Sequence, residues 1–373
     1  MRDRVLLTPA SASAAPPAPF AASFLIHPEG FPEEVAGRPC GDTAADLLLP
    51  AGPYRIDGLA AAQLRRLAER FGGFCVPAAT GAAGPPGARR ESGRPKARRA
   101  VANAPGGPML GSPVPPEPAF VPGSDAPVEL RVFAAPPRSF RRAMPAGWQY
   151  SFDLDPRPER VRLAGWGFCA LLERLPGGAW RAGLWVAPGD RRGFLGACTN
   201  LLRVVAAYRL LDAGGALLHS AAVAHGGPHG DRGTLFVGRS GAGKSTVARQ
   251  ARGRGLGVLS DELAALIPAP GGCAVAALPF AGDLEPAREP VAPLRLARVL
   301  LLEQAGRDAL VPASRARAVA AAAACAPWIN ADPHRASRLL DNLGRLFVGV
   351  EVARLEFTRG GGFWPLLEMP EAA

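Results

Sequence analysis

A stretch near the middle of the chain constrains the fold more than any other. Residues 235–237 (Leu-Phe-Val) are typical of a buried strand, and a glycine-rich loop and a helical pattern to about residue 253 follow. The loop matches G-x-x-x-x-G-K-[ST], the phosphate-binding pattern, in the strand-to-helix context that the pattern requires. The predicted nucleotide-binding residues are Gly238, Arg239, Ser240, Gly241, Ala242, Gly243, Lys244, Ser245 and Thr246.

Each residue type in this loop has a physical reason to be there. Glycine permits positive φ and a close approach of the backbone to a polyphosphate. The free N–H groups and the positive end of the following helix attract the anion, Lys244 reaches the β and γ phosphates, and Ser245 offers its hydroxyl to Mg²⁺. Of the 43 basic residues only Lys96 and Lys244 are lysine. Lysine at 244 therefore indicates a need for a compact point charge that arginine does not supply.

The 373 residues allow two or three domains, and 48% hydrophobic content is ample for a core. Segment 78–127 contains 19 Pro and Gly residues without a period, which predicts a linker. Strand patterns between 128 and 186 indicate an antiparallel sheet, a helix is predicted over 194–211, and a strand hairpin on either side of residues 225–232 leads into the loop. The predicted units are a disordered segment 1–22, a small α+β unit 23–77, the linker 78–127, a β-rich segment 128–193 and a catalytic domain 194–373.

The net charge of +11 raises the question of nucleic acid, but Arg89 to Arg99 alone contribute +5. A basic tract without interleaved aromatic residues is typical of a solvated linker, so nucleic-acid binding is not favoured. The six cysteines form no C-x-x-C pair, which favours free thiols over a zinc site. No apolar run reaches the length of a membrane span and the N-terminus is a poor signal peptide, so we expect a cytoplasmic protein without membrane contact.

Two carboxylates follow the loop closely. Asp261 and Glu262 lie 17 and 18 residues after Lys244, at the end of the next predicted strand. In a parallel βαβ unit this position faces the phosphates, where such a pair can hold a metal ion and accept a proton. The alternative is that Asp261 caps a following helix and Glu262 is solvated. His219, in the strand before the loop, either supports this chemistry or is an ordinary core histidine.

The segments Leu218-His-Ser-Ala-Ala-Val223, Gly238 to Thr246 and Val258-Leu-Ser-Asp-Glu262 are similar, in order and spacing, to the catalytic core of HPr kinase/phosphorylase and its relatives. The resemblance covers roughly residues 195–300. It implies an α/β fold with a nucleotide-binding core of the HPr kinase and phosphoenolpyruvate-carboxykinase type, preceded by the β-rich segment and the small α+β unit. It also implies that His219 is catalytic, that Asp261 is the base toward a serine and that Glu262 helps to hold Mg²⁺.

The chain departs from that family by having Asp261-Glu262 in place of two aspartates and Thr246 in place of a glutamate. The expected function is an ATP- and Mg²⁺-dependent kinase that phosphorylates a serine of a small protein or peptide, either HPr-like or ribosomally made. Alternatives are a nucleotide-binding switch without phosphoryl transfer and a small-molecule kinase. A homo-oligomer is compatible with the family.

Overall fold

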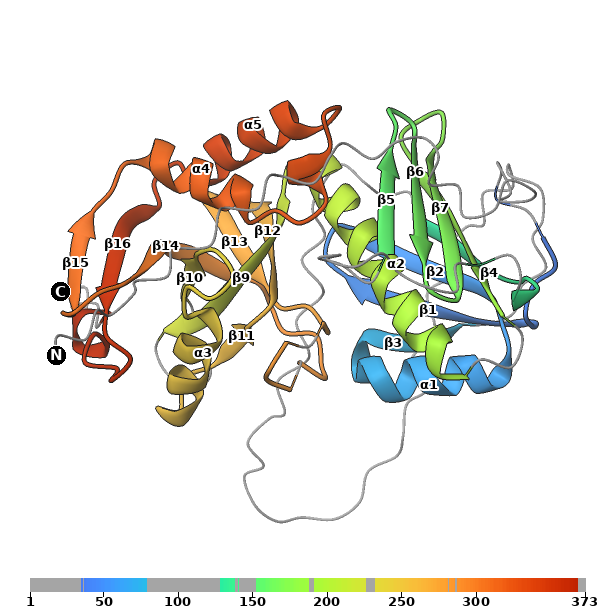
Figure 1. The fold of residues 1–373 in the computed structure, drawn as a ribbon, viewed down its shortest axis with the longest axis horizontal. Coiled ribbons are helices and arrows are strands. Elements are labelled where there is room, and N and C mark those ends of the chain that lie inside the picture. Colours follow the sequence, from blue (N-terminus) through green and yellow to red (C-terminus); the bar gives the residue numbers. More distant parts are fainter. Residues whose placement is uncertain are drawn as a thin grey trace, which may run out of the picture.

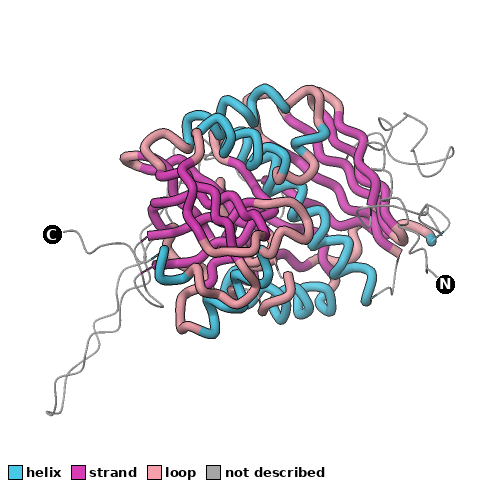
Figure 2. The backbone as a smooth tube through the Cα atoms, turned by 60° about the vertical axis from the view of Figure 1, so that its left-hand side comes forward, coloured by secondary structure: helices cyan, strands magenta, loops and turns pink. Residues whose placement is uncertain are grey.

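The structure is a computed structural model that describes residues 35, 37–78, 128–137, 140, 152–187, 191–225, 232–280, 282–285 and 287–367. It is a mixed α/β fold in which two large sheets dominate and helices are few (Figures 1 and 2). The predicted disordered segment 1–22 lies outside the described residues. So does the predicted linker 78–127, apart from Ala78, and with it the basic tract.

Within the described residues, the first sheet has eight strands in the order β3-β1-β2-β4-β8-β7-β6-β5. Their bounds are β1 Thr43–Leu49, β2 Gly52–Leu59, β3 Cys75–Ala78, β4 Val128–Ala134, β5 Phe152–Pro156, β6 Arg160–Gly165, β7 Phe168–Arg174 and β8 Trp180–Val186. Helix α1 (Ala61–Phe71) buries Leu67 and Phe71 and ends at the short helix η2 (Gly72–Phe74).

Two expectations about this region need correction. The small unit 23–77 is not separate, because β2 pairs in parallel with β4 and so extends the sheet of the β-rich segment. That sheet is also not wholly antiparallel, since β4 pairs in parallel with β8. Alternating burial predicts that a strand exists and which face is buried, whereas the choice of neighbour is made by contacts between distant segments.

The second sheet follows the order β10-β9-β12-β13-β14-β16-β15, and β10 also pairs in parallel with β14. That extra pairing closes β10, β9, β12, β13 and β14 into a ring of strands. The bounds are β9 Ala216–His225, β10 Arg232–Val237, β11 Val258–Ser260, β12 Leu263–Ala269, β13 Gly272–Ala276, β14 Leu294–Gln304, β15 Ala309–Pro312 and β16 Glu351–Phe357. The remaining helices here are α3 Lys244–Gly253, α4 Arg315–Ala324, η4 Ile329–Ala331, α5 Ala336–Leu346 and η5 Trp364–Leu367.

Helix α2 (Arg191–Asp212) lies between the two sheets (Figure 1). It contacts β7 and β8 of the first sheet and β9 and β12 of the second. Contrary to the sequence-based expectation, its segment Gly193–Asp212 is long and apolar enough to cross a membrane, but 72% of its most apolar stretch is buried inside the fold. Such burial is typical of a core helix in a soluble protein. Helix α2 therefore belongs to the core on both sheets.

A buried ion pair holds the C-terminal part against the first sheet. The carboxylate of Asp332 has 0% exposure and accepts hydrogen bonds from Arg335 Nη1 (2.8 Å) and Tyr208 Oη (2.9 Å). The guanidinium of Arg335 also donates to the carbonyl oxygens of Arg157 (3.0 Å) and Pro158 (2.6 Å), which follow strand β5. We call this set, Asp332, Arg335 and Tyr208, the buried latch.

Candidate functional site

The predicted strand, loop and helix are present as β10, residues 238–243 and α3. Gly241 and Gly243 have φ values of 80° and 108°, which other residue types rarely adopt. A Cβ at Gly243 would also lie 2.6 Å from Cζ of Phe357, so this position has no room for a side chain. Arg239, Ser240 and Gly241 are exposed, and the loop backbone is therefore accessible to a ligand.

Lys244 opens helix α3 and turns back beneath the loop. Its side chain is buried, with 5% exposure for the residue, and Nζ donates to the carbonyl oxygens of Gly238 (2.8 Å) and Arg239 (3.0 Å). Burial lowers its pKa. Ser245 and Thr246 follow in the first helical turn and are half-buried. The ammonium group of Lys244 thus lies directly beneath a loop that is exposed to solvent.

The acidic pair follows a strand that runs parallel to β10 but is not its neighbour. Strands β10 and β11 each pair antiparallel with β9, which lies between them, so they are parallel to each other. The expected parallel βαβ direction is therefore found, with β9 inserted between the two strands. After α3 the chain passes to the far side of β9, and Asp261 and Glu262 lie between β11 and β12.

Asp261 is buried, with 7% exposure, and does not cap a helix, because strand β12 follows it. Its Oδ2 accepts a hydrogen bond from the backbone N–H of Leu284 at 2.9 Å. A Cβ at Gly282 would lie 2.7 Å from the same oxygen, so the loop after β13 packs closely on this carboxylate. Asp283, in that loop, forms an exposed ion pair with Arg249 (3.1 Å).

Glu262 is not simply solvated. Its Oε2 lies 3.0 Å from Nη2 of Arg203 on α2, and both side chains are largely covered. Burial raises the pKa of Glu262, and the charges of Asp261 and Asp283 act in the same direction, while Arg203 and Arg70 lower it. Two carboxylates and two guanidinium groups therefore act on the carboxylate of Glu262.

His219 lies on β9, between the loop and the acidic pair. Its backbone N–H donates to the carbonyl oxygen of Cys325 (2.7 Å), and Leu263, directly after Glu262, is its partner in the β9–β12 register. Its pKa is lowered, first by burial and then by the charge of Lys244, whereas a hydrogen bond to the backbone of Glu262 raises it. The charge of Lys244 and the segment that carries the acidic pair therefore both act on the imidazole.

Sequence reasoning missed three side chains that contribute to this site. Arg203 comes from α2 and Arg70 from α1, whereas Cys325 follows α4 and donates from Sγ to the carbonyl oxygen of Gly238 at 3.4 Å. An arginine inside the otherwise apolar pattern of α2 was a signal that could have drawn attention to Arg203. For Arg70 and Cys325 no such local signal exists.

The described residues contain no cluster of three or more His, Cys, Asp or Glu side chains suited to a metal ion. Magnesium, however, typically uses one or two carboxylates together with phosphate oxygens and water. The hydroxyl of Ser245 and the carboxylate of Glu262 are hard oxygen donors of the type that Mg²⁺ prefers. The donor chemistry here thus fits a magnesium ion bound jointly with a nucleotide.

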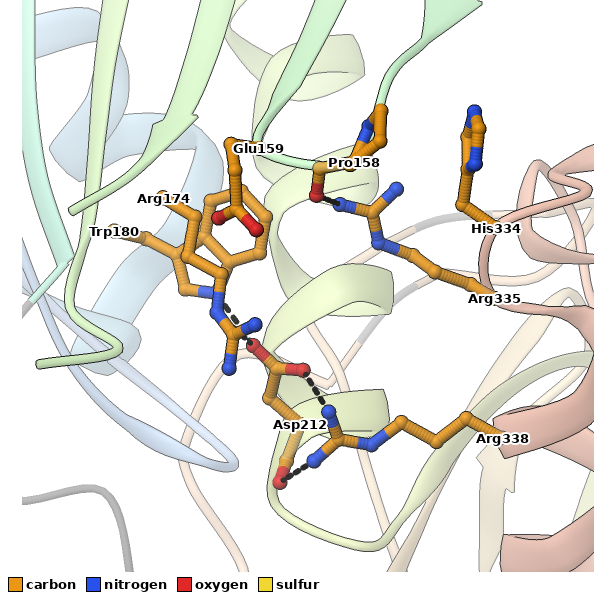
Figure 3. A pocket seen from close by; sticks show the side chains of 8 residues that line it. All are labelled: Pro158, Glu159, Arg174, Trp180, Asp212, His334, Arg335 and Arg338. Atoms are coloured by element: carbon orange, nitrogen blue, oxygen red, sulfur yellow. Dashed lines mark hydrogen bonds and ion pairs between the residues drawn. The ribbon is translucent and has the colours of Figure 1, made fainter. Parts of the chain in front are cut away.

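A separate pocket of about 310 Å³ lies where the β5–β6 turn meets the end of α2 and the start of α5 (Figure 3). It is lined by Pro158, Glu159, Arg174, Trp180, Asp212, His334, Arg335 and Arg338. Asp212 accepts from Nε1 of Trp180 (2.9 Å) and pairs with Arg338 (2.9 Å), and Arg335 belongs to the buried latch. None of the lining residues comes from the 238–246 segment, and these polar groups bind one another across a junction, so we assign the pocket a structural role.

No protein-family model matches this chain, and no curated protein matches it significantly.

Proposed function

We propose that the protein is an ATP- and Mg²⁺-dependent kinase that transfers the γ-phosphoryl group to a serine hydroxyl of a small protein or peptide. The observation that supports this most is the position of His219 on β9. Its neighbour Ser220 lies opposite Val237, directly before the loop, and His219 itself lies opposite Leu263, directly after Glu262. A loop suited to phosphate and a pair of carboxylates thus come within electrostatic range of one histidine.

In this proposal, residues 238–246 form the phosphate-binding core of an HPr-kinase-like domain. The loop N–H groups and the start of α3 hold the phosphates, because both present partial positive charge. Lys244 leaves the carbonyl oxygens of Gly238 and Arg239 and pairs with phosphate oxygens instead. Ser245 and Glu262 would hold Mg²⁺, which when bound offsets the negative charge of the phosphate oxygens.

Asp261 is proposed as the base. As the serine oxygen forms its bond to the γ phosphorus, the hydroxyl proton moves to the carboxylate of Asp261, and the bond from phosphorus to the bridging oxygen breaks to release ADP. The hydrogen bond from the N–H of Leu284 fixes the orientation of this carboxylate. His219, with its lowered pKa, remains neutral near pH 7 and accepts or donates hydrogen bonds beside the acidic pair without adding charge.

The same proposal places the protein in the cytoplasm. All six cysteines are free, and five of them are buried. Free thiols accord with a reducing compartment, where disulfides are rare.

Transfer of label from γ-labelled ATP tests the function. Wild-type protein and Asp261→Asn are incubated with Mg²⁺ and a lysate of the native organism, and labelled proteins and metabolites are separated. We expect a labelled small protein or peptide with the wild type and a loss of about 10²–10⁴-fold with Asp261→Asn, the range typical of a general base. Asparagine can still accept the hydrogen bond from Leu284, so the fold should be retained.

Asp283→Asn is the matched control, because Asp283 is exposed and pairs only peripherally with Arg249. It should retain nearly full transfer. Label confined to an acid-soluble metabolite would replace the peptide acceptor by a small molecule. Tight ATP binding with no transfer to either class would refute the kinase proposal in favour of a switch.

A further inference from the structure

Two arginines from distant parts of the chain act on Glu262, and a third acts on one of them. Arg70 lies on α1, Arg203 on α2 and Arg288 in the segment between β13 and β14. Burial lowers the pKa of Arg70 most, and the charges of Arg203 and Arg288 lower it further. We call Arg70, Arg203 and Arg288 the arginine cluster.

Direct contacts with the β13–β14 segment fix this arrangement. Nη1 of Arg70 donates to the carbonyl oxygen of Pro279 (3.3 Å), and the guanidinium of Arg203 lies 5.6 Å from the ring centroid of Phe280. The ring of Phe71 meets Phe280 edge to face, with centroids 6.4 Å apart.

The backbone completes the junction, because the N–H of Gly73 donates to the carbonyl oxygen of Arg288 at 2.8 Å. The end of α1 therefore packs against the β13–β14 segment, and its residue Arg70 acts on Glu262. The predicted small N-terminal unit thereby contributes a side chain to the candidate site.

More positive than negative charges act on Arg70. The cations are Arg203 and Arg288, and the carboxylate is Glu262, which pairs with Arg203. Asp261 and Asp283 act on Glu262, and the carboxylate of Glu289 lies against Gly73. Arg288 is exposed to solvent. Like charges held together are destabilising unless an anion lies among them. Guanidinium groups bind carboxylates and phosphates through paired hydrogen bonds, which suits this region to an anionic ligand.

We propose that Arg70 and Arg288 bind an anionic group of the acceptor, next to the serine that is phosphorylated, so that the acceptor is an acidic peptide segment. Arg203 is instead a positioning residue, because it holds Glu262. This inference rests on the proposed kinase function and specifies its substrate class. The anion is a side-chain carboxylate, a C-terminal carboxylate or a phosphate already on the peptide, since all three present the same oxygens to a guanidinium.

The test uses the full-length protein, Mg²⁺, γ-labelled ATP and synthetic serine peptides. One set places Asp, Asn or Lys at each position flanking serine, a second ends in a free carboxylate or an amide next to serine, and a third carries a neighbouring phosphoserine. We expect at least about tenfold more transfer to one anionic set than to its neutral partner, because a hydrogen bond to a charged group contributes about 1.5–3 kcal/mol.

Arg70→Gln and Arg288→Gln should each raise the KM for the preferred anionic peptide about tenfold while changing the KM for ATP less than about twofold. Arg65→Gln is the matched control, because Arg65 is an exposed residue of the same helix. It should behave as the wild type. Far-UV circular dichroism verifies that each variant is folded.

Equal transfer to anionic and neutral peptides, or unchanged KM values in Arg70→Gln and Arg288→Gln, would overturn the inference and leave the kinase proposal standing. If the wild type labels its native acceptor but no synthetic peptide, mapping the labelled serine decides: acidic neighbours support the inference, and neutral or basic neighbours overturn it. No transfer to any acceptor would overturn the proposed function, and the inference with it.

Discussion

The buried latch is the most quantitative test of how the two halves of the molecule are held together. Replacing Arg335 by methionine removes the cation but leaves Asp332, at 0% exposure, with its charge. The side chain of Arg335 is itself only 10% exposed, so solvent screens this pair weakly. Removing one partner of a buried pair costs about 3–5 kcal/mol, because the remaining charge loses its compensation.

Urea unfolding, followed by tryptophan fluorescence and by far-UV circular dichroism, measures this loss where the two transitions coincide. The corresponding fall in Tm is roughly 6–20 °C, taking about 2–4 °C per kcal/mol for domains of 150–250 residues. Arg338→Met, in the first turn of the helix that Arg335 precedes, is the control. Its ion pair with Asp212 is more exposed, with 45% exposure of the Arg338 side chain, and should contribute at most about 1 kcal/mol.

A double-mutant cycle separates the charge pairing from the other contacts of Arg335. Arg335 also donates to the carbonyl oxygens of Arg157 and Pro158, and those bonds are lost whether or not residue 332 is charged. Asp332→Asn combined with Arg335→Met should therefore lose less stability than the two single variants added together, by at least about 1 kcal/mol. Additive losses, or an Arg335→Met variant within about 0.5 kcal/mol of the wild type, would refute the reasoning.

Two further predictions concern the candidate site. Gly243→Ala should weaken ATP binding at least about tenfold in titration calorimetry and lower the free energy of unfolding by about 1–3 kcal/mol. The reason is that the new Cβ meets Phe357 at a backbone φ of 108°. Gly253→Ala is the control, because no atom lies within 4 Å of its new Cβ, and it should change neither quantity in this way. Because the pKa of His219 is lowered in the folded state, the unfolded chain binds a proton more readily. The free energy of unfolding of the wild type should therefore fall as the pH drops below the unfolded pKa of about 6.5, and that of the His219→Asn variant should fall less. His225, whose pKa burial also lowers, remains in both proteins, so equal pH dependence would show that His219 is not the cause.

The local structure around the loop could be predicted well from the sequence. The strand at 235–237, the glycines at 241 and 243 and the helix to Gly253 are all found as expected. The hairpin of β9 and β10 is confirmed too, with Ser220 opposite Val237. These features depend on short-range rules, because positive φ requires glycine and burial patterns follow the period of each element.

The assembly of the site could be predicted only in part. His219, Lys244, Asp261 and Glu262 were all singled out from the sequence, and β10 and β11 run parallel as expected, but the sequence did not show that β9 lies between them. The assembly of Arg70 with Arg203 next to Glu262 was not predicted at all. Those arginines lie 192 and 59 residues before Glu262 along the chain.

The sequence by itself determined where this chain turns, which segments form strands and helices, and which residue types can meet a phosphate. Only the tertiary structure decided that the strands of 43–59 and 128–186 share one sheet, that α2 lies between the two sheets, and that Arg70 of α1 acts on Glu262. The physical reason is that turns and burial patterns are set by a few neighbouring residues. The pairing of strands and the meeting of distant charges depend on the summed free energy of contacts across the whole fold.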